Sequence, residues 1–369
     1  MDCREVKTIA MMKSLLSAIF LIAIPGCVEM SIVDNNTLIH SLGYDYIDEN
    51  TIEGTINMPV YGPREKVTSQ SISTRAHTSR DLRSELNRQT PLPIHVGRLS
   101  SIIFNRQLAE EIGLIQTIDT FMRDPKIGMR IYLGIAEGSA KDVLMNKYDI
   151  EEEVASYLRE LIDQNIRTQN LPQTNLHLFL RDYYAEGQDP YLPYLVPVAN
   201  RIAVDGLALF KGDKFVYHLD EEYLCVIKIL LERVERGPIK LRLPNGDFTV
   251  LRSINSHSTY HITGDLNQPK VEIVLHFKGI VTEYTGRPDK GIDEATYEMI
   301  KQQLANKLEN EAKELTSLFQ SLEIDPLGLG SRMKAQTRGF DIEKWEAVYP
   351  TIPIETKAEI KIYDTGVRE

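Results

Sequence analysis

A short apolar segment near the start of the chain decides how much of the sequence can take part in a fold. Residues 14–24 (SLLSAIFLIAI) form a run of eleven largely apolar residues, preceded by the positive charge of Lys13. A run of this length is typical of the hydrophobic region of an export signal, and it is too short to span a bilayer as a helix. We therefore leave residues 1–26 out of the interpretation of the fold.

The cysteine that follows this segment gives it a specific interpretation. Residues 24–27 (IPGC) resemble a bacterial lipobox, in which a small residue precedes a cysteine whose thiol accepts a diacylglyceryl group. The weaker alternative is an N-terminal core helix that carries an incidental cysteine. The sequence thus predicts a signal peptide with a lipobox over residues 1–27 and lipidation of Cys27. We expect a lipid-anchored, exported protein on the outer face of a membrane.

Charge and cysteine content narrow the classes of partner. The chain after Cys27, about 340 residues, is long enough for two or three domains with their own cores. A net charge of −11 argues against nucleic acid, which requires basic patches, and against electrostatic adhesion to anionic lipid. The lipid on Cys27 must therefore provide the anchoring. Cys225 is the one other cysteine after the signal, so an intramolecular disulfide is not expected.

Strand and helix patterns alternate through residues 28–190, which predicts an N-terminal α/β region. Strands are expected at residues 51–60, 98–104 and 129–136. Helices are expected at residues 78–89 and 106–121, directly after a turn at residues 137–140, and at residues 150–166. Residues 61–76 are polar and rich in serine and threonine, so we expect an exposed loop there. Residues 183–197 (YYAEGQDPYLPYLVP) are expected to connect two domains. The alternative is a partner-binding strip, because tyrosine is favoured at interfaces.

Residues 198–369 are expected to form a C-terminal α+β domain. Asp205 and Gly206 form a strong hairpin-turn signal between short strands at residues 201–204 and 207–210. The other expected elements are a helix at residues 220–234, strands at residues 239–243, 248–253, 259–262 and 271–283, a short helix around Trp345, and a closing strand at residues 352–363. A long amphipathic helix at residues 293–322 should pack on one face of a mostly antiparallel sheet. The fold class is therefore α+β, with several domains, mixed or antiparallel sheets and flanking helices.

Two groups of side chains invite a reading as reactive or metal-binding sites. His257 and His261 could share one face of a strand, yet neither a nearby cysteine nor a helical His-Glu motif completes a metal site. Asp45, Asp48 and Glu49 could form an acid/base pair, but a solvated loop is the favoured interpretation. The sequence assigns neither group a role in catalysis or metal binding.

Residues 138–140 and Cys225 could also suggest a functional site, but a structural role is the favoured interpretation for both. Residues 138–140 resemble a helix N-terminus that could bind an anion, although they lack the denser glycines of a phosphate loop. Cys225 lies in an apolar helical pattern and is expected to be a small core residue rather than a nucleophile. A nucleophile elbow, a Walker loop and a dinucleotide loop are all missing from the sequence. We therefore assign no catalytic residue, metal or cofactor.

Several motifs occur in an order that points to one family. After the lipobox they are residues 42–45 (LGYD), 92–99 (LPIHVGRL), 121–125 (FMRDP), 131–133 (IYL), 137–144 (EGSAKDVL), 206–211 (GLALFK) and 325–330 (DPLGLG), then Trp345 and Thr365-Gly366. This ordered set resembles the Ger(x)C family, the lipoprotein C subunits of spore germinant receptors. One departure is that residues 28–31 (VEMS) lack the tryptophan that the family usually has directly after the lipidated cysteine.

The resemblance implies a function as well as a fold. It implies a non-catalytic lipoprotein subunit of a nutrient germinant receptor that is required for spore germination. Its partners would be two integral membrane subunits, of the A and B type, and its place the outer face of the cell membrane or the spore inner membrane. The alternative is an extracytoplasmic solute-binding lipoprotein. Such a protein needs a preformed cleft and a hinge between two similar lobes, and the dissimilar halves expected here disfavour it. No small-molecule ligand can be assigned.

Overall fold

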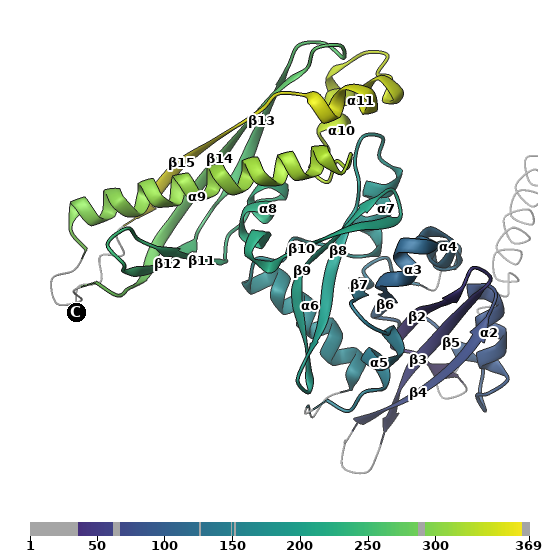
Figure 1. Cartoon of the computed structure of the whole chain (residues 1–369). Helices are drawn as coiled ribbons and strands as arrows, with labels where there is room; N and C mark the ends of the chain where they lie inside the picture. Colours follow the sequence, from purple (N-terminus) through teal and green to yellow (C-terminus); the bar gives the residue numbers. More distant parts are fainter. Residues whose placement is uncertain are drawn as a thin grey trace, which may run out of the picture. The chain divides into compact units, whose positions relative to one another are not determined.

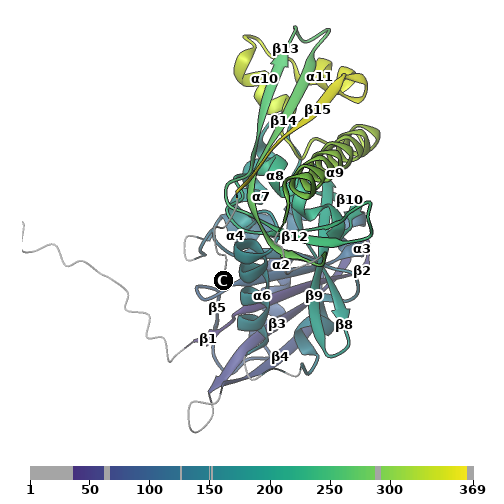
Figure 2. The same ribbon diagram turned by 90° about the vertical axis from the view of Figure 1, so that its left-hand side faces the viewer.

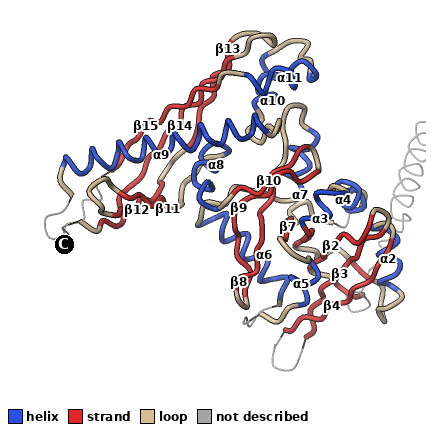
Figure 3. Tube along the Cα trace, viewed as in Figure 1, coloured by secondary structure: helices blue, strands red, loops and turns tan. Residues whose placement is uncertain are grey.

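The computed structural model describes residues 36–61, 67–124, 127–148, 150, 153–286 and 292–363 of the 369-residue chain. The signal peptide, Cys27 and residues 365–366 therefore lie outside the described residues. Two large sheets with flanking helices dominate the described part, which confirms the mixed α+β class (Figure 1 and Figure 3). The chain from Thr37 onward forms one compact unit.

The first sheet, as far as the chain is described, has eight strands in the order β10-β9-β8-β7-β6-β2-β3-β4. The strands are β2 (Ser41–Asp48), β3 (Thr51–Tyr61), β4 (Val67–Ala76), β6 (Ser101–Asn105), β7 (Tyr132–Ala136), β8 (Tyr191–Val198), β9 (Arg201–Lys211) and β10 (Lys214–Leu219). The central strands β2, β6, β7 and β8 run parallel, while the pairs β3–β4 and β9–β10 flank them in antiparallel fashion. A small parallel pair, β1 (Thr37–Leu38) and β5 (Ile94–His95), forms a sheet of its own.

Helices cover both faces of this sheet, because parallel strands are usually buried on both sides. The helices packed on one face are α2 (Ser79–Asn87), α3 (Arg106–Glu111), α4 (Ile115–Met122) and α7 (Leu176–Tyr184). The helices packed on the other face are α5 (Ala140–Met145) and α6 (Val154–Thr168). Strand alternation divides the two cores: Ile102 and Phe104 of β6 belong to the first, and Ile103 to the second.

The second sheet is built around the long strand β14. Its strands are β11 (Pro238–Arg242), β12 (Phe248–Ser253), β13 (His257–Thr263), β14 (Lys270–Tyr284) and β15 (Ile354–Tyr363). Strands β12 and β13 pair antiparallel with β14, β11 extends the sheet beyond β12, and β15 runs parallel to β14. The expected mostly antiparallel sheet with a closing strand is therefore confirmed.

Helix α9 (Glu294–Ser321) packs on this second sheet, as expected for residues 293–322 (Figure 2). Its side chains that are buried most completely recur at helical spacing, and they include Ile300, Leu304, Leu308 and Leu315. They share one core with alternate residues of β14, such as Ile273 and Leu275. Two short helices, α10 (Leu329–Gln336) and α11 (Ile342–Val348), lead from α9 to β15, and α11 carries Trp345 as expected.

The prediction of an exposed loop at residues 61–76 is wrong, because Val67–Ala76 forms the edge strand β4. Its hydroxyl groups are used across the sheet rather than in solvent. Thr55 Oγ1 of β3 donates to Ser73 Oγ, and Ser71 Oγ donates to the carbonyl oxygen of Leu144 in α5. A strand can therefore be rich in serine and threonine where a helix and a neighbouring strand supply hydrogen-bond partners for its side chains.

The prediction that residues 183–197 connect two domains is also wrong. Helix α7 ends at Tyr184, and Tyr191–Val198 forms β8 inside the eight-stranded sheet. The prolines suggested a break, but Pro193 lies where the ladder is irregular, and Pro197 forms a regular pair with Ile202. The pairing with β9 shifts register between Pro193 and Leu195, and β7 pairs with β8 only at Tyr194 and Leu195.

The hairpin expected at Asp205-Gly206 is wrong as well, because β9 runs without a turn from Arg201 to Lys211. Gly206 has a positive φ of 110° and lies where the register between β8 and β9 shifts, so the pair forms a bulge instead of a turn. Strands β9 and β10 consequently belong to the first sheet. That sheet extends beyond residue 198, where we expected the C-terminal domain to begin.

The single helix expected at residues 106–121 is divided into α3 and α4. Gly113, with a φ of 84°, breaks the helical pattern between them. Asp213, in the turn between β9 and β10, then bonds to the start of α4: its carbonyl oxygen accepts from Leu114 N, and its Oδ2 accepts from Ile115 N. The helix expected at residues 220–234 is shorter, with a 3-10 turn at Glu221–Tyr223 and α8 at Leu224–Leu231.

Candidate functional site

Asp45, from the LGYD segment, is bound to the start of α5, which lies within the EGSAKDVL segment. Its Oδ1 and Oδ2 accept hydrogen bonds of 2.7 and 2.8 Å from the backbone N–H groups of Ala140 and Lys141. Asp45 is only 5% exposed, so the solvated loop expected for it is wrong, whereas Asp48 and Glu49 are exposed. Burial raises the pKa of Asp45, and the two N–H groups counteract that effect.

This arrangement also shows why residues 138–140 do not offer an open site for a bound anion. The N–H groups that could receive a bound anion are already occupied by the carboxylate of Asp45. Gly43, two residues earlier on β2, allows α5 to approach, because a side chain there would lie 3.0 Å from Leu144 Cδ1 and 3.2 Å from Ala140 Cβ. The two segments thus fasten a helix to the sheet and form no open anion site.

Replacement of Asp45 by alanine is expected to lower the free energy of unfolding by about 2–3 kcal/mol, because it leaves the buried N–H group of Ala140 and the partly buried N–H group of Lys141 without acceptors. Glu49→Ala, an exposed acidic residue in the turn that follows the same strand, is the matched control and should change stability by less than about 0.5 kcal/mol. Urea unfolding of the chain after Cys27, monitored by circular dichroism, measures both. Equal losses in the two variants would contradict the assigned role of Asp45.

A second pair of carboxylates, Asp189 and Asp325, joins the first sheet to the segment after α9. The two residues bond reciprocally: Asp325 N donates to Asp189 Oδ2 at 2.8 Å, and Asp189 N donates to the carbonyl oxygen of Asp325 at 3.0 Å. Asp189 Oδ1 also accepts from Gly212 N at 2.7 Å, and Asp325 Oδ2 accepts from Gly330 N at 2.8 Å. Three of these contacts therefore link the DPLGLG segment, the entry to β8 and the β9–β10 turn, and the fourth, from Gly330 N, lies within the DPLGLG segment itself.

The electrostatics of this pair centre on Asp325. Its side chain is buried, and burial, with a smaller contribution from the charge of Asp189, raises its pKa to about 7 against the opposing effect of the N–H groups of Gly330, Leu329 and Gly328. Gly328 has a positive φ of 63°, as expected for a glycine in this segment, and precedes α10. Sequence reasoning found the DPLGLG segment but missed Asp189, which lies in no recognisable motif.

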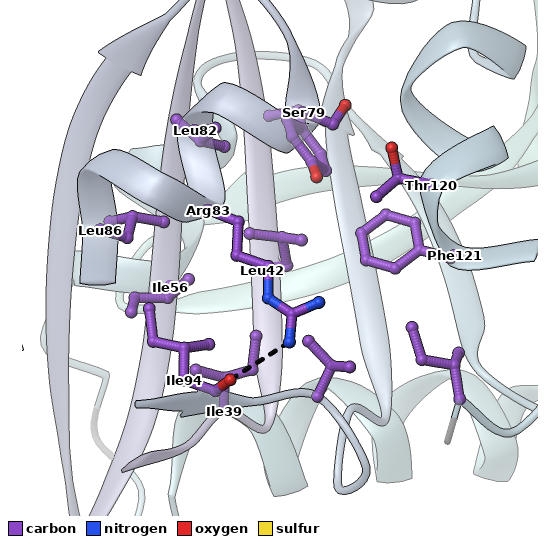
Figure 4. Close-up of a pocket in the computed structure, with 13 residues that line it drawn as sticks. Ile39, Leu42, Ile56, Ser79, Leu82, Arg83, Leu86, Ile94, Thr120 and Phe121 are labelled. Atoms are coloured by element: carbon purple, nitrogen blue, oxygen red, sulfur yellow. Dashed lines mark hydrogen bonds between the residues drawn. The ribbon is translucent and has the colours of Figure 1, made fainter. Parts of the chain in front are cut away.

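A small cavity of about 30 Å³ lies beneath α2 (Figure 4). Its walls are mostly apolar and include Leu42, Ile56 and Phe121. Arg83 reaches across it and donates a hydrogen bond from Nη2 to the carbonyl oxygen of Ile94 at 3.3 Å. A space of this size holds about one water molecule, so it is a packing feature rather than a ligand site.

The remaining candidate residues are not brought together. His257 lies opposite His276 with ring centroids 4.9 Å apart, whereas His261 lies opposite Glu272 on the neighbouring strand. Within the described residues there is no group of three metal-ligating side chains that could hold a metal ion. Cys225 is buried in α8, and burial raises the pKa of its thiol to about 12, which suppresses the thiolate that a nucleophile requires.

Cys27, the predicted lipidation site, lies outside the described residues. Among the helices that are described, none has both the length and the apolar character needed to cross a membrane.

Comparison with known proteins gives consistent matches along the chain. Residues 29–197 match the family model "Spore germination protein N-terminal domain", and residues 205–366 match "Spore germination B3/GerAC like, C-terminal". The spore germination protein GerQC of Bacillus cereus is 27% identical over 358 residues, which cover 96% of this chain and 98% of that protein. The putative spore germination protein YfkR of Bacillus subtilis is 22% identical and covers 80% of this chain and 78% of its own length.

One solved structure has the same fold. The crystal structure of the GerBC protein superposes with a TM-score of 0.54 at 17% sequence identity, and the match covers 87% of this chain and 96% of that one. The N-terminal and C-terminal family models together span nearly the whole chain in the expected order. The chain therefore belongs to the Ger(x)C family, the C subunits of spore germinant receptors.

Proposed function

We propose that the chain acts as a non-catalytic, lipid-anchored subunit of a nutrient germinant receptor and is required for spore germination. Its place is the outer face of the cell membrane or the spore inner membrane, where a diacylglyceryl group on Cys27 holds it. Its partners are two integral membrane subunits of the A and B type. Tethering confines the subunit to the membrane plane and so raises its effective concentration near them.

The observation that carries the non-catalytic role is what the shared segments do in the fold. The carboxylate of Asp45 binds the start of α5, and the carboxylate of Asp189 binds the backbone N–H groups of Asp325 and Gly212. Acidic side chains used in this way hold elements in place and are not free to act on a substrate. This supports a protein that works through its surfaces rather than through a reactive centre.

The solute-binding alternative gains no support from the architecture. A hinged binding protein has two similar lobes around a cleft. Here the first sheet has a parallel centre covered by helices on both faces, and the second is largely antiparallel around β14 with α9 packed on it. The two halves differ in strand order and strand direction, so they cannot close as two equivalent lobes.

The experiment that tests the proposal combines deletion with purification. Spores of a deletion strain should lose the response to at least one nutrient, and a copy of the gene supplied in trans should restore it. A tagged copy, purified from detergent-solubilised spore membranes, should bring two integral membrane proteins with it, whereas an untagged strain provides the control. A normal response to every nutrient, together with purification of the subunit alone, would reject the proposal.

A further inference from the structure

A larger cavity opens beside Asp189 and Asp325. Its volume is about 430 Å³, within the range of small-molecule sites. Its walls come from the segment between α7 and β8, the β9–β10 turn, the segment that follows α9, and helix α11. Parts of the chain that are far apart in sequence therefore build one cavity.

The walls of this cavity are strongly acidic. The carboxylates that line it belong to Glu186, Asp189, Glu323, Asp325 and Glu346. Among the described lining residues Lys211 supplies the one ammonium group, and it already donates a hydrogen bond to the carbonyl oxygen of Glu323. Glu186 is paired with Lys334 at 3.0 Å, and the other carboxylates still leave an excess of negative charge, which attracts cations and concentrates them.

Asp325 provides an independent sign that the cavity takes a ligand. The residue is only 4% exposed, and while its Oδ2 accepts from Gly330 N, its Oδ1 has no hydrogen-bond partner in the described part of the chain. A buried carboxylate oxygen without a partner is unfavourable unless a donor or a positive charge reaches it. Asp325 lines the cavity, so a cation bound there would supply the missing counter-charge.

The other walls favour an organic cation over a metal ion. Trp345 and Tyr349 of the α11 region line the cavity with ring centroids 5.8 Å apart, and aromatic faces attract ammonium groups. The hydroxyl group of Tyr349 already donates to the carbonyl oxygen of Ile324 at 2.7 Å, so it is not available to a ligand, and the side chain is only 4% exposed. Within the described residues the acidic side chains do not cluster closely enough to hold a metal ion.

We propose that this cavity binds the ammonium group of an organic amine, with Asp325 as its buried counter-charge and Glu346 at its exposed rim. The amine is either a free small molecule or the side chain of a lysine in a partner protein, since both present the same group. The site is distinct from the tether at Cys27 and does not depend on it.

The test measures binding to the full-length chain in detergent by isothermal titration calorimetry at pH 8, where Asp325 is ionised. The probes are 1,5-diaminopentane, the neutral 1,5-pentanediol of the same length, and a blocked Gly-Lys-Gly peptide. We expect the diamine or the peptide to bind and the diol not to bind. Tighter binding of the diamine assigns the site to a free amine, whereas peptide binding that is at least as tight assigns it to a lysine side chain.

Two variants assign the binding to this cavity. Asp325→Asn keeps an acceptor for Gly330 N but removes the charge, and Glu346→Gln changes an exposed side chain that cannot disturb the core. Each should weaken binding about tenfold, the effect of removing one charge from a partly buried pair. Glu160→Gln, an equal change of charge on α6, should leave affinity unchanged. Binding of neither amine, equal binding of the diol, or full affinity in both variants would overturn the proposal.

Discussion

Replacement of Gly206 by alanine is expected to lower the free energy of unfolding by about 4 kcal/mol or more, a large part of the roughly 5–15 kcal/mol that is typical of a folded domain. Gly206 has a φ of 110°, and a Cβ atom there would lie 1.9 Å from the carbonyl oxygen of Leu219 in β10. A backbone atom cannot move aside as a flexible side chain can, so the contact would force β9 and β10 apart. Positive φ adds strain of about 1–2 kcal/mol for any residue with a side chain.

Gly246 is the matched control for this prediction. It also has a positive φ, of 90°, but it lies in the turn between β11 and β12 with open space around the position of a Cβ atom. Gly246→Ala should therefore cost only the backbone strain, about 1–2 kcal/mol. Urea unfolding of the chain after Cys27 measures both variants. Similar losses at the two positions would show that the contact with Leu219 does not determine stability.

Replacement of Cys27 by alanine is expected to move the protein from the membrane fraction to the soluble fraction. Two acyl chains give stable anchoring, since each buried CH₂ group contributes about 0.8 kcal/mol. The net charge of −11 offers no electrostatic substitute at an anionic surface. Ultracentrifugation of spore lysates measures the distribution, and the nutrient response of the same spores should be impaired. Near-ultraviolet circular dichroism of the released protein should be unchanged.

Cys225→Ala provides the control for the lipid, because it removes the other cysteine that follows the signal. That side chain is buried in α8, so its loss should affect stability modestly and leave the protein in the membrane fraction. Membrane association of the Cys27→Ala protein, with a normal response to nutrients, would contradict the predicted tether.

The second sheet and its helix could be read from the sequence because their signals are local. The apolar residues of α9 recur every three or four positions, and those of β14 alternate, so each periodicity identifies its element and the face that it buries. The family resemblance likewise rests on short segments in a fixed order. Such signals depend only on residues close together in sequence, so they can be recognised without knowing how distant parts of the chain pair.

The first sheet could be predicted only in part, because long-range pairing overrides local signals there. Asp205-Gly206 is a turn signal in isolation, but in the sheet β9 is held between β8 and β10 and the pair becomes a bulge. The contacts of Asp45 with α5 and of Asp189 with Asp325 join residues about 95 and 136 positions apart. Nothing in the spacing along the chain predicts them.

Lys228 illustrates the same limit for a single side chain. It lies in the apolar helix α8 and is 4% exposed, yet its Nζ donates hydrogen bonds to the carbonyl oxygens of Ile166 and Gln169, where α6 ends. A charged residue in an apolar helix is usually read as solvent-facing, and its partners become known only once the two helices are placed together.

The position of β9 and β10 has a consequence for how such a gene can change over time. The gap between the two matched family regions, residues 29–197 and 205–366, extends from the end of β8 into the start of β9. Most of β9 and all of β10 therefore come from the C-terminal region but complete the sheet of the N-terminal one. Recombination between two family members at this boundary would combine β8 of one protein with β9 of another. The two strands would then not be matched to each other, so we expect the two regions to be inherited together.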